Sequence, residues 1–179
     1  MRLRIIALVV LCVAATGALA QKDADARDET REKVRSLLET AGQLEDVKCE
    51  FHQSTKDPYN FVGSIDDGLK NAESLEIIIR VSKSDTINLR VWPHYKGGYI
   101  NLEKAKDARG MMKRLLQYND ENFLFWGADD SKDVFTGYSI TLESGFPEEA
   151  MTIVLRSIRN ADRYVGELRT FIDGSPARK

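Results

Sequence analysis

The sequence predicts an α+β fold, an antiparallel sheet of about five strands with helices packed on it in the order α-βββ-α-ββ-α. Three observations support this prediction. Two segments with alternating apolar residues flank a polar turn between Ser74 and His94. A second pair of such segments lies between residues 123 and 142, and an apolar repeat of helical period runs from Pro147 to Ile172. A period of two is typical of half-buried strands, and steps of three or four are typical of amphipathic helices.

Residues 1–20 have the composition of a secretory signal peptide. Arg2 and Arg4 form a basic start, an apolar run follows from Ile5 to Ala15, and small residues end the segment at Ala20. This succession is the signature of an export signal that is removed on secretion. We therefore expect an exported protein, periplasmic or extracellular, without stable membrane insertion after cleavage.

The rest of the chain predicts one domain with short extensions. Residues 21–28 are charged and predict a flexible linker, residues 29–172 predict a single α+β domain, and residues 173–179 predict a disordered tail. The formal net charge is −2, and it becomes −4 without residues 1–20, which contain two arginines and no acidic residue. Because the remaining lysines and arginines are scattered, we expect no nucleic-acid partner.

The first elements of the domain are a helix and a strand. Apolar residues at helical spacing predict a helix from Glu29 to Ala41, and Gly42 is a suitable residue just past its end. Val47, Cys49 and Phe51 then alternate with polar residues, as in a half-buried strand. Without residues 1–20 the chain has one cysteine, so no internal disulfide can form. We expect a buried, unreactive Cys49, and an intermolecular disulfide is the alternative.

No group of residues predicts catalysis or a bound cofactor. Cys49 and His52 are an odd number of residues apart, so in a strand their side chains point to opposite faces. The acidic turn from Asp129 to Asp133 resembles part of a calcium loop, but it lacks the glycine and the closing glutamate of such loops. With two histidines in the chain, a zinc site is also not expected. We interpret the chain as a non-enzyme with no metal and no cofactor.

The segment from His52 to Glu73 is long for a loop in a compact domain. Pro58, Gly63 and Gly68 are turn formers within it. We therefore expect this segment to contain a short strand from Asn60 to Gly63.

The hairpin between Ser74 and His94 is the clearest part of the predicted sheet. Its two strands each carry one apolar face and are joined by the polar residues 82–85. The apolar faces consist of Leu75, Ile77, Ile79, Val81, Ile87, Leu89 and Val91.

The second half of the domain predicts a helix, two strands and a long final helix. The helix spans Ala105 to Tyr118, the strands are Phe123–Trp126 and Val134–Leu142, and the last helix runs from Pro147 to Ile172. On the first of these helices the predicted core-facing residues are Ala108, Met111, Met112, Leu115 and Leu116. On the last helix they are Val154, Ile158, Ala161, Val165, Leu168 and Ile172.

These segments resemble the type III secretion chaperone-like fold and, within it, the YbjN-like family of bacterial domains. The similarity covers residues 29–172. It is carried by MMKRLLQYNDENFLFWGADD at 111–130, by GYSITLESGFPEEAMTIVLRSI at 137–158 and by the apolar repeat as far as Ile172. The family pattern is a helix ending in leucines and asparagine, a hairpin with an acidic turn, and a long last helix. Here its places are taken by Leu115, Leu116, Asn119, Phe123, Phe125 and Asp129.

The resemblance implies a non-catalytic and often dimeric domain. Within this fold, the secretion chaperones hold a partner segment in extended form. We therefore expect a chaperone-like or regulator-like domain that binds a protein or peptide, with a homodimer as one arrangement. The alternatives are a small-molecule carrier, a carboxylate-using enzyme of the cell envelope, and a structural envelope protein. Aromatic residues suit partner binding because they bury much area at small entropic cost, although the rim of the core would also hold them. The candidates are Trp92, Tyr95, Tyr99, Phe123, Phe125 and Trp126.

Overall fold

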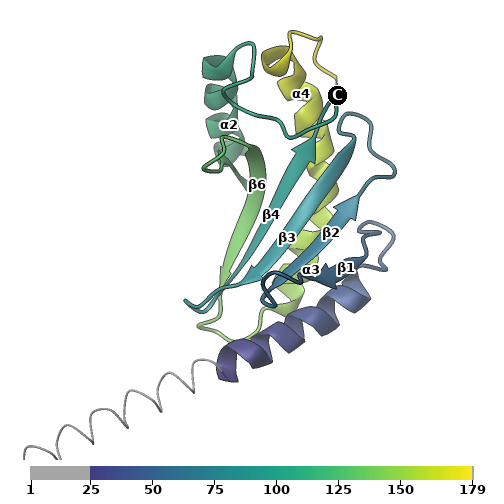
Figure 1. The fold of residues 1–179 in the computed structure, drawn as a ribbon, viewed down its shortest axis with the longest axis vertical. Helices are drawn as coiled ribbons and strands as arrows, with labels where there is room; N and C mark the ends of the chain where they lie inside the picture. Colours follow the sequence, from purple (N-terminus) through teal and green to yellow (C-terminus); the bar gives the residue numbers. More distant parts are fainter. Residues whose placement is uncertain (1–24, 179) are drawn as a thin grey trace, which may run out of the picture.

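The structure, a computed structural model, describes residues 25–178, which form an antiparallel sheet with helices packed on it. The prediction of an α+β fold is therefore confirmed (Figure 1). The strands are β1 (Phe51–Gln53), β2 (Asn60–Ile65), β3 (Ser74–Val81), β4 (Thr86–His94), β5 (Phe125–Ala128) and β6 (Val134–Thr141). The helices are the N-terminal helix (residues 25–41), α2 (Ala108–Glu121), α3 (Glu148–Ser157) and α4 (Ala161–Ile172), with the 3₁₀ turn η1 (Ile158–Asn160) between the last two.

The sheet has six strands rather than about five, in the order β1-β2-β3-β4-β6-β5. The additional strand is β2, which contains the short strand expected at Asn60–Gly63, extends it to Ile65 and pairs with β3 over its whole length. The middle one of its three buried positions is Gly63, which has no apolar side chain, and this weakens the sequence signal. The first strand is also shorter than expected. Val47 and Cys49 are buried before β1 begins, since Lys48 has a positive φ of 44° and Cys49 N–H donates to Gly42 C=O.

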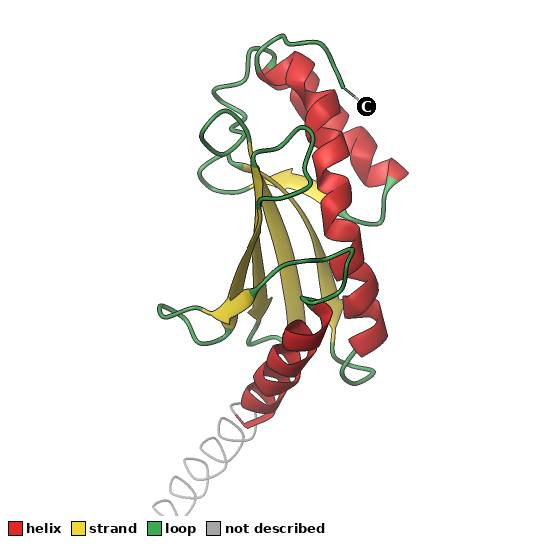
Figure 2. Cartoon of the chain, turned by 90° about the vertical axis from the view of Figure 1, so that its right-hand side faces the viewer, coloured by secondary structure: helices red, strands yellow, loops and turns green. Residues whose placement is uncertain are grey.

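The helices cover one face of the sheet, and the opposite face is free of helices. Figure 2 shows α3 and α4 running along the covered face, and Figure 1 looks onto the helix-free face. Strand alternation divides the side chains between the faces, so the predicted hairpin residues all point toward the helices. Buried residues of the covered face include Phe61, Ile65, Leu75, Ile77, Ile79, Val81, Ile87, Leu89, Val91, Trp126 and Val134.

The last helix is interrupted rather than continuous. Residues Ile158–Asn160 form a 3₁₀ turn, but the backbone stays right-handed helical on both sides of it, so the apolar repeat continues. Five of the six predicted core-facing residues are buried, and Ile172 is half-buried. From the turn, the Arg159 guanidinium donates to Val47 C=O at 3.1 Å and to Asp67 C=O at 2.8 Å. Arg159 in the 3₁₀ turn thus connects the last helix to the loops that contain Val47 and Asp67.

A buried carboxylate connects α4 to the loop before β3. Asp162 is 8% exposed and accepts hydrogen bonds from the backbone N–H groups of Lys70, Asn71 and Ala72 at 2.7–2.9 Å. Burying a carboxylate is favourable only when such donors replace its water. Asp162 therefore fixes the position of residues 70–72 on the helix.

Both ends of the domain are more ordered than the sequence predicts. Residues 25–28, expected in a flexible linker, are helical, because the Arg27 guanidinium donates to Val81 C=O at 2.7 Å and stacks 3.4 Å from the Tyr59 ring. At the other end, the expected disordered tail folds back, and Arg178 N–H donates to Gly166 C=O at 3.0 Å. The expected signal peptide and residues 21–24 lie outside the described residues.

Replacing Gly63 by alanine tests the packing around β2. An added Cβ would lie 2.5 Å from Cys49 Sγ and 2.8 Å from Phe51 Cδ1, so the core must shift. We expect Gly63→Ala to lower the free energy of unfolding by about 1–3 kcal/mol in urea denaturation, the usual cost of overpacking. The control is Gly98→Ala, since a Cβ there meets nothing within 4 Å. Equal stability of the two variants would show that the Cys49 region adapts without cost.

Removing the Asp162 carboxylate tests the connection between α4 and the loop. In Asp162→Ala three buried or half-buried N–H groups lose their acceptor. We expect the free energy of unfolding to fall by about 2–4 kcal/mol and amide hydrogen exchange at residues 70–72 to accelerate. Asp120→Ala, at an exposed position of α2, should change stability by less than about 0.5 kcal/mol. Unchanged exchange at residues 70–72 would contradict the role given to Asp162.

Candidate partner-binding surface

The six aromatic candidates lie in two places, and their exposure differs. Trp92, Tyr95 and Tyr99 lie at the end of β4 and in the loop after it. The other three lie immediately before β5 or within it. Tyr99, Phe123 and Phe125 are exposed, whereas Trp92 and Tyr95 are half-buried and Trp126 is buried.

The first group makes intramolecular hydrogen bonds. Trp92 Nε1 donates to Asp129 at 3.2 Å, and the Tyr95 hydroxyl donates to Asp173 at 3.1 Å. The Tyr99 hydroxyl donates to Glu76 at 2.7 Å, and this hydrogen bond raises the pKa of Tyr99 to about 12. These rings are held in place by the domain itself. Of the three, Tyr99 keeps a large exposed area.

Trp126 belongs to the core, so its assignment to a partner-binding surface is wrong. It is 4% exposed and packs against Tyr118 and Tyr164, each with 5.5 Å between ring centroids. The Asn119 side chain accepts from Trp126 N–H at 2.5 Å and donates to its C=O at 3.2 Å. Strand alternation then turns Trp126 toward the helices and Phe125 away from them.

Phe123 and Phe125 are exposed beside β6. Phe123 is 53% exposed and meets Tyr138 edge-on, with 5.9 Å between ring centroids. Phe125 is 37% exposed and meets Phe135 edge-on at 5.8 Å. The two phenylalanines therefore present apolar area next to the same strand.

The outer edge of β6 is only half covered by β5. Strand β6 pairs with β4 from Thr136 to Thr141 but with β5 only from Val134 to Gly137. Residues 138–141 thus have a strand on one side only within the described part of the chain. Leu142 N–H donates to Asp85 C=O, on the β4 side. Because backbone groups of alternate residues point to opposite edges, those of Ser139 and Thr141 point outward.

This free edge is short, but it lacks the charge and the proline that often protect edge strands. Exposed edges are usually short, charged or interrupted by proline, which prevents pairing with other chains. Residues 138–141 are Tyr-Ser-Ile-Thr, without charge or proline. We call residues 138–141 together with Phe123 and Phe125 the edge surface.

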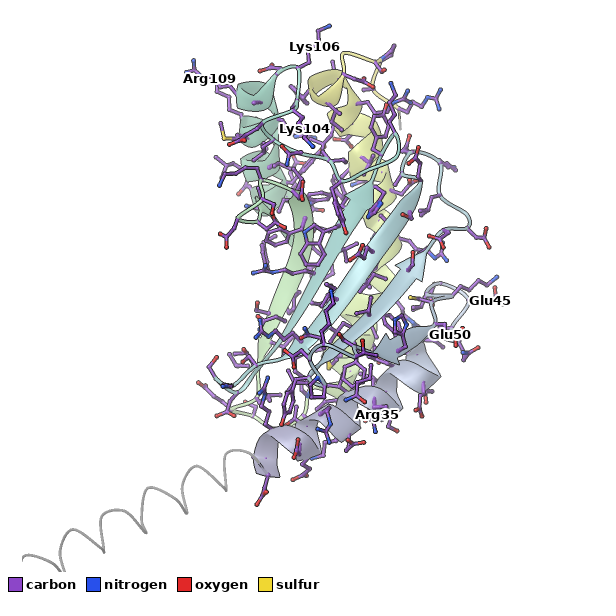
Figure 3. All side chains as sticks on the ribbon, in the orientation of Figure 1. Arg35, Glu45, Glu50, Lys104, Lys106 and Arg109 are labelled. Atoms are coloured by element: carbon purple, nitrogen blue, oxygen red, sulfur yellow. The ribbon has the colours of Figure 1, made fainter. Side chains whose placement is uncertain are left out.

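The labelled charges in Figure 3 lie at other borders of the molecule. Lys104, Lys106 and Arg109 lie around the start of α2, and Glu45 and Glu50 lie beside β1. Strand β1 forms the opposite edge of the sheet from β5 and β6. The edge surface itself contains no charged residue, and the labelled charges lie elsewhere on the molecule.

Sequence reasoning missed a further exposed apolar pair on α2. Met112 is 48% and Leu116 is 70% exposed, although both were predicted to face the core. The buried residues of α2 are Met111, Leu115 and Tyr118. In the pairs Met111-Met112 and Leu115-Leu116 only one member of each can point inward, since neighbouring residues lie about 100° apart on a helix.

A groove also lies between the N-terminal helix and α3. Its volume is about 620 Å³, and its lining combines apolar residues such as Leu44 and Phe146 with Lys33, Glu148 and Arg156. It is wide open and mixed in character. No group of titratable residues in it points to a reaction.

Cys49 is buried, as predicted. Its side chain is 4% exposed, and Sγ lies 3.5 Å from Ser64 C=O. Burial raises the pKa of the Cys49 thiol to about 12, because the thiolate would lose its water. His52 is exposed on β1, so the structure does not bring these two residues together as a nucleophile and a base.

The acidic turn is a structural hairpin turn. The Asp129 carboxylate accepts from Ser131 N–H at 2.9 Å and from Asp133 N–H at 3.0 Å. Within residues 25–178, no group of three or more His, Cys, Asp or Glu residues is placed to hold a metal ion. No helix in the same span has the length and apolarity needed to cross a bilayer.

Thiol labelling tests the environment of Cys49. We expect an aromatic disulfide reagent at pH 8 to modify the native protein at least about 100-fold more slowly than the chain unfolded in guanidinium, because the thiol is both enclosed and protonated. The control is Ser144→Cys in a Cys49→Ala background, since Ser144 is exposed, and it should react at once in the native state. Rapid stoichiometric labelling of native Cys49 would contradict its burial.

Comparison of the chain with protein-family models, curated proteins and solved structures gives no match.

Proposed function

We propose that this domain is a non-enzymatic binding module that holds an extended segment of a protein or peptide partner against the edge surface. The observation that supports this proposal is the free, uncharged edge of β6 beside two exposed phenylalanines. Extended peptides bind sheets in this way by adding a strand, with backbone hydrogen bonds giving affinity and side-chain contacts giving selectivity.

The geometry sets what a partner segment would need. The outward N–H and C=O groups of Ser139 and Thr141 offer hydrogen bonds to a strand of about four or five residues. Alternate side chains of that strand would contact Phe125 on the helix-free side and Phe123 with Tyr138 on the other. A segment with apolar or aromatic residues at every second position fits both sides.

This proposal agrees with the resemblance to the secretion chaperones, which hold partners in extended form. It also accommodates an exported location, in which the domain would hold a partner of the cell envelope. Both the family and the location remain part of the proposal.

A second copy of the chain is the other occupant that the same edge favours. Two β6 strands placed antiparallel around Ile140 would pair Ser139 of one copy with Thr141 of the other. Such a self-complementary contact is the usual geometry of a twofold dimer. In such a homodimer, the β6 strand of the second copy would pair with residues 138–141, which β5 does not reach.

Blocking the backbone of Ser139 tests the proposal. Ser139→Pro removes the outward N–H while leaving the hydrogen bonds of β6 to β4, whereas Ser139→Ala removes only the hydroxyl, which donates to Asn88. From a displayed library of 12-residue peptides, we expect the natural protein to select sequences with alternating apolar residues. The dissociation constant of a selected peptide, measured by fluorescence anisotropy, should rise at least about tenfold in Ser139→Pro, about 1.4 kcal/mol. In Ser139→Ala it should change by less than about threefold, less than about 0.7 kcal/mol.

Two further measurements identify the occupant. Peptide binding should slow amide exchange at Ser139 and Thr141. Sedimentation that gives a dimer for the natural protein and a monomer for Ser139→Pro would assign the edge to a second copy. A monomer that selects no peptide, or a selected peptide that binds Ser139→Pro as tightly as the natural protein, would overturn the proposal.

A further inference from the structure

A recess lies on the helix-free face of the sheet. Its volume is about 310 Å³, at the lower end of the range of small-molecule sites. Strands β2, β3 and β4 supply its lining, and Figure 3 looks onto this face. The lining residues are Asn60, Ile78, Arg80, Asn88, Arg90 and Trp92.

Two arginines line this recess. Arg80 lies opposite Asn88 and Arg90 lies opposite Ile78, so the two arginines are diagonal neighbours on one face. Such neighbours are within reach of each other's long side chains.

Neither arginine makes an ion pair or a hydrogen bond with the described part of the chain. The Arg90 guanidinium stacks on the Phe135 ring, whose centroid lies 4.6 Å from the guanidinium carbon. Stacking on a ring occupies a face of the guanidinium and leaves its N–H groups available, because these point outward in its plane. The recess therefore offers a set of unoccupied charged donors.

The nearest carboxylates are engaged elsewhere. Glu76, on the same face, accepts from the Tyr99 hydroxyl at 2.7 Å and lies 3.5 Å from His94 Nε2. Asp129 accepts from Trp92 Nε1 and from two amides of its own turn. Neither acid pairs with the arginines.

The remaining walls give the recess further chemistry. Ile78 and the Trp92 ring are its apolar part. Asn60 Oδ1 is enclosed and has no hydrogen-bond partner in the described structure. Because Oδ1 is an acceptor, it could take only a hydrogen-bond donor of a bound molecule and gives no attraction to a carboxylate.

We infer that this recess binds a small organic anion whose carboxylate lies between Arg80 and Arg90 and whose apolar body packs against Ile78 and Trp92. Paired guanidinium groups match the planar, bidentate geometry of a carboxylate. The apolar wall favours an organic acid over an inorganic anion, which would leave that wall in contact with water. The site does not depend on the edge surface.

Calorimetry with matched probes tests the inference. The probes are 3-phenylpropionate, its uncharged amide and inorganic phosphate. We expect the carboxylate to bind at least tenfold more tightly than either of the other two, and its affinity to fall as salt is added. Arg80→Gln and Arg90→Gln should each weaken binding at least tenfold, whereas Arg109→Gln, at an exposed position on α2, should leave it unchanged.

Further variants separate folding and the edge surface from the recess. Arg80→Lys and Arg90→Lys keep the charge but lose the planar, forked set of guanidinium donors. The affinity of these variants for the carboxylate should therefore lie between those of the natural protein and the glutamine variants, while their thermal unfolding stays near that of the natural protein. Phe123→Ala should bind the carboxylate as the natural protein does, even where it loses a selected peptide. Phosphate binding as tightly as 3-phenylpropionate, equal binding of acid and amide, or no binding of the carboxylate at 10 mM would each overturn the inference.

Discussion

The packing of the C-terminal helical run on one face of the sheet determines the rest of the structure. Val154, Leu155, Ile158, Val165 and Leu168 are at most 4% exposed. At roughly 1.5–3 kcal/mol for each side chain, their burial is on the order of 10 kcal/mol before conformational entropy is subtracted. Since this run and α2 pack on the same face, the other face and one edge of the sheet keep solvent contact. Asp162 places the run by binding three amides of the loop before β3.

This one-sided arrangement explains where binding chemistry can occur. On the covered face, polar groups such as Asp162 and the Tyr118 hydroxyl are taken up by internal hydrogen bonds. On the helix-free face, alternate residues of the same strands point to solvent, so Arg80 and Arg90 can remain without a hydrogen bond or an ion pair to the described part of the chain. The short strand β5 leaves the outward backbone groups of Ser139 and Thr141 unpaired within the described part of the chain. A peptide and a small anion would thus use different parts of one sheet.

The sequence predicts those features that depend on strong periodicity. The hairpin around residues 82–85 and the repeat of the last helix follow from seven and six apolar positions at regular spacing, and Cys49 is buried as its neighbours indicate. Features set by single tertiary contacts were not predicted. The full length of β2 beyond the expected Asn60–Gly63 is one of them, because Gly63, whose side-chain position is filled by Cys49 and Phe51, interrupts the apolar pattern. The inward position of Trp126, which is bound through Asn119, is another. The recess joins residues of three strands whose register no local pattern gives, and the free edge depends on where β5 begins.

The two proposed sites touch at one hydrogen bond but use different directions of the sheet. Ser139 Oγ donates to Asn88 Oδ1 at 2.7 Å, and Asn88 lines the recess while the backbone of Ser139 belongs to the free edge. A strand added at the edge bonds in the plane of the sheet, whereas an anion in the recess approaches along the side chains, perpendicular to that plane. Neither ligand needs the space of the other. Because the hydroxyl of Ser139 points to the face and its N–H to the edge, each group can be altered while the other keeps its partner.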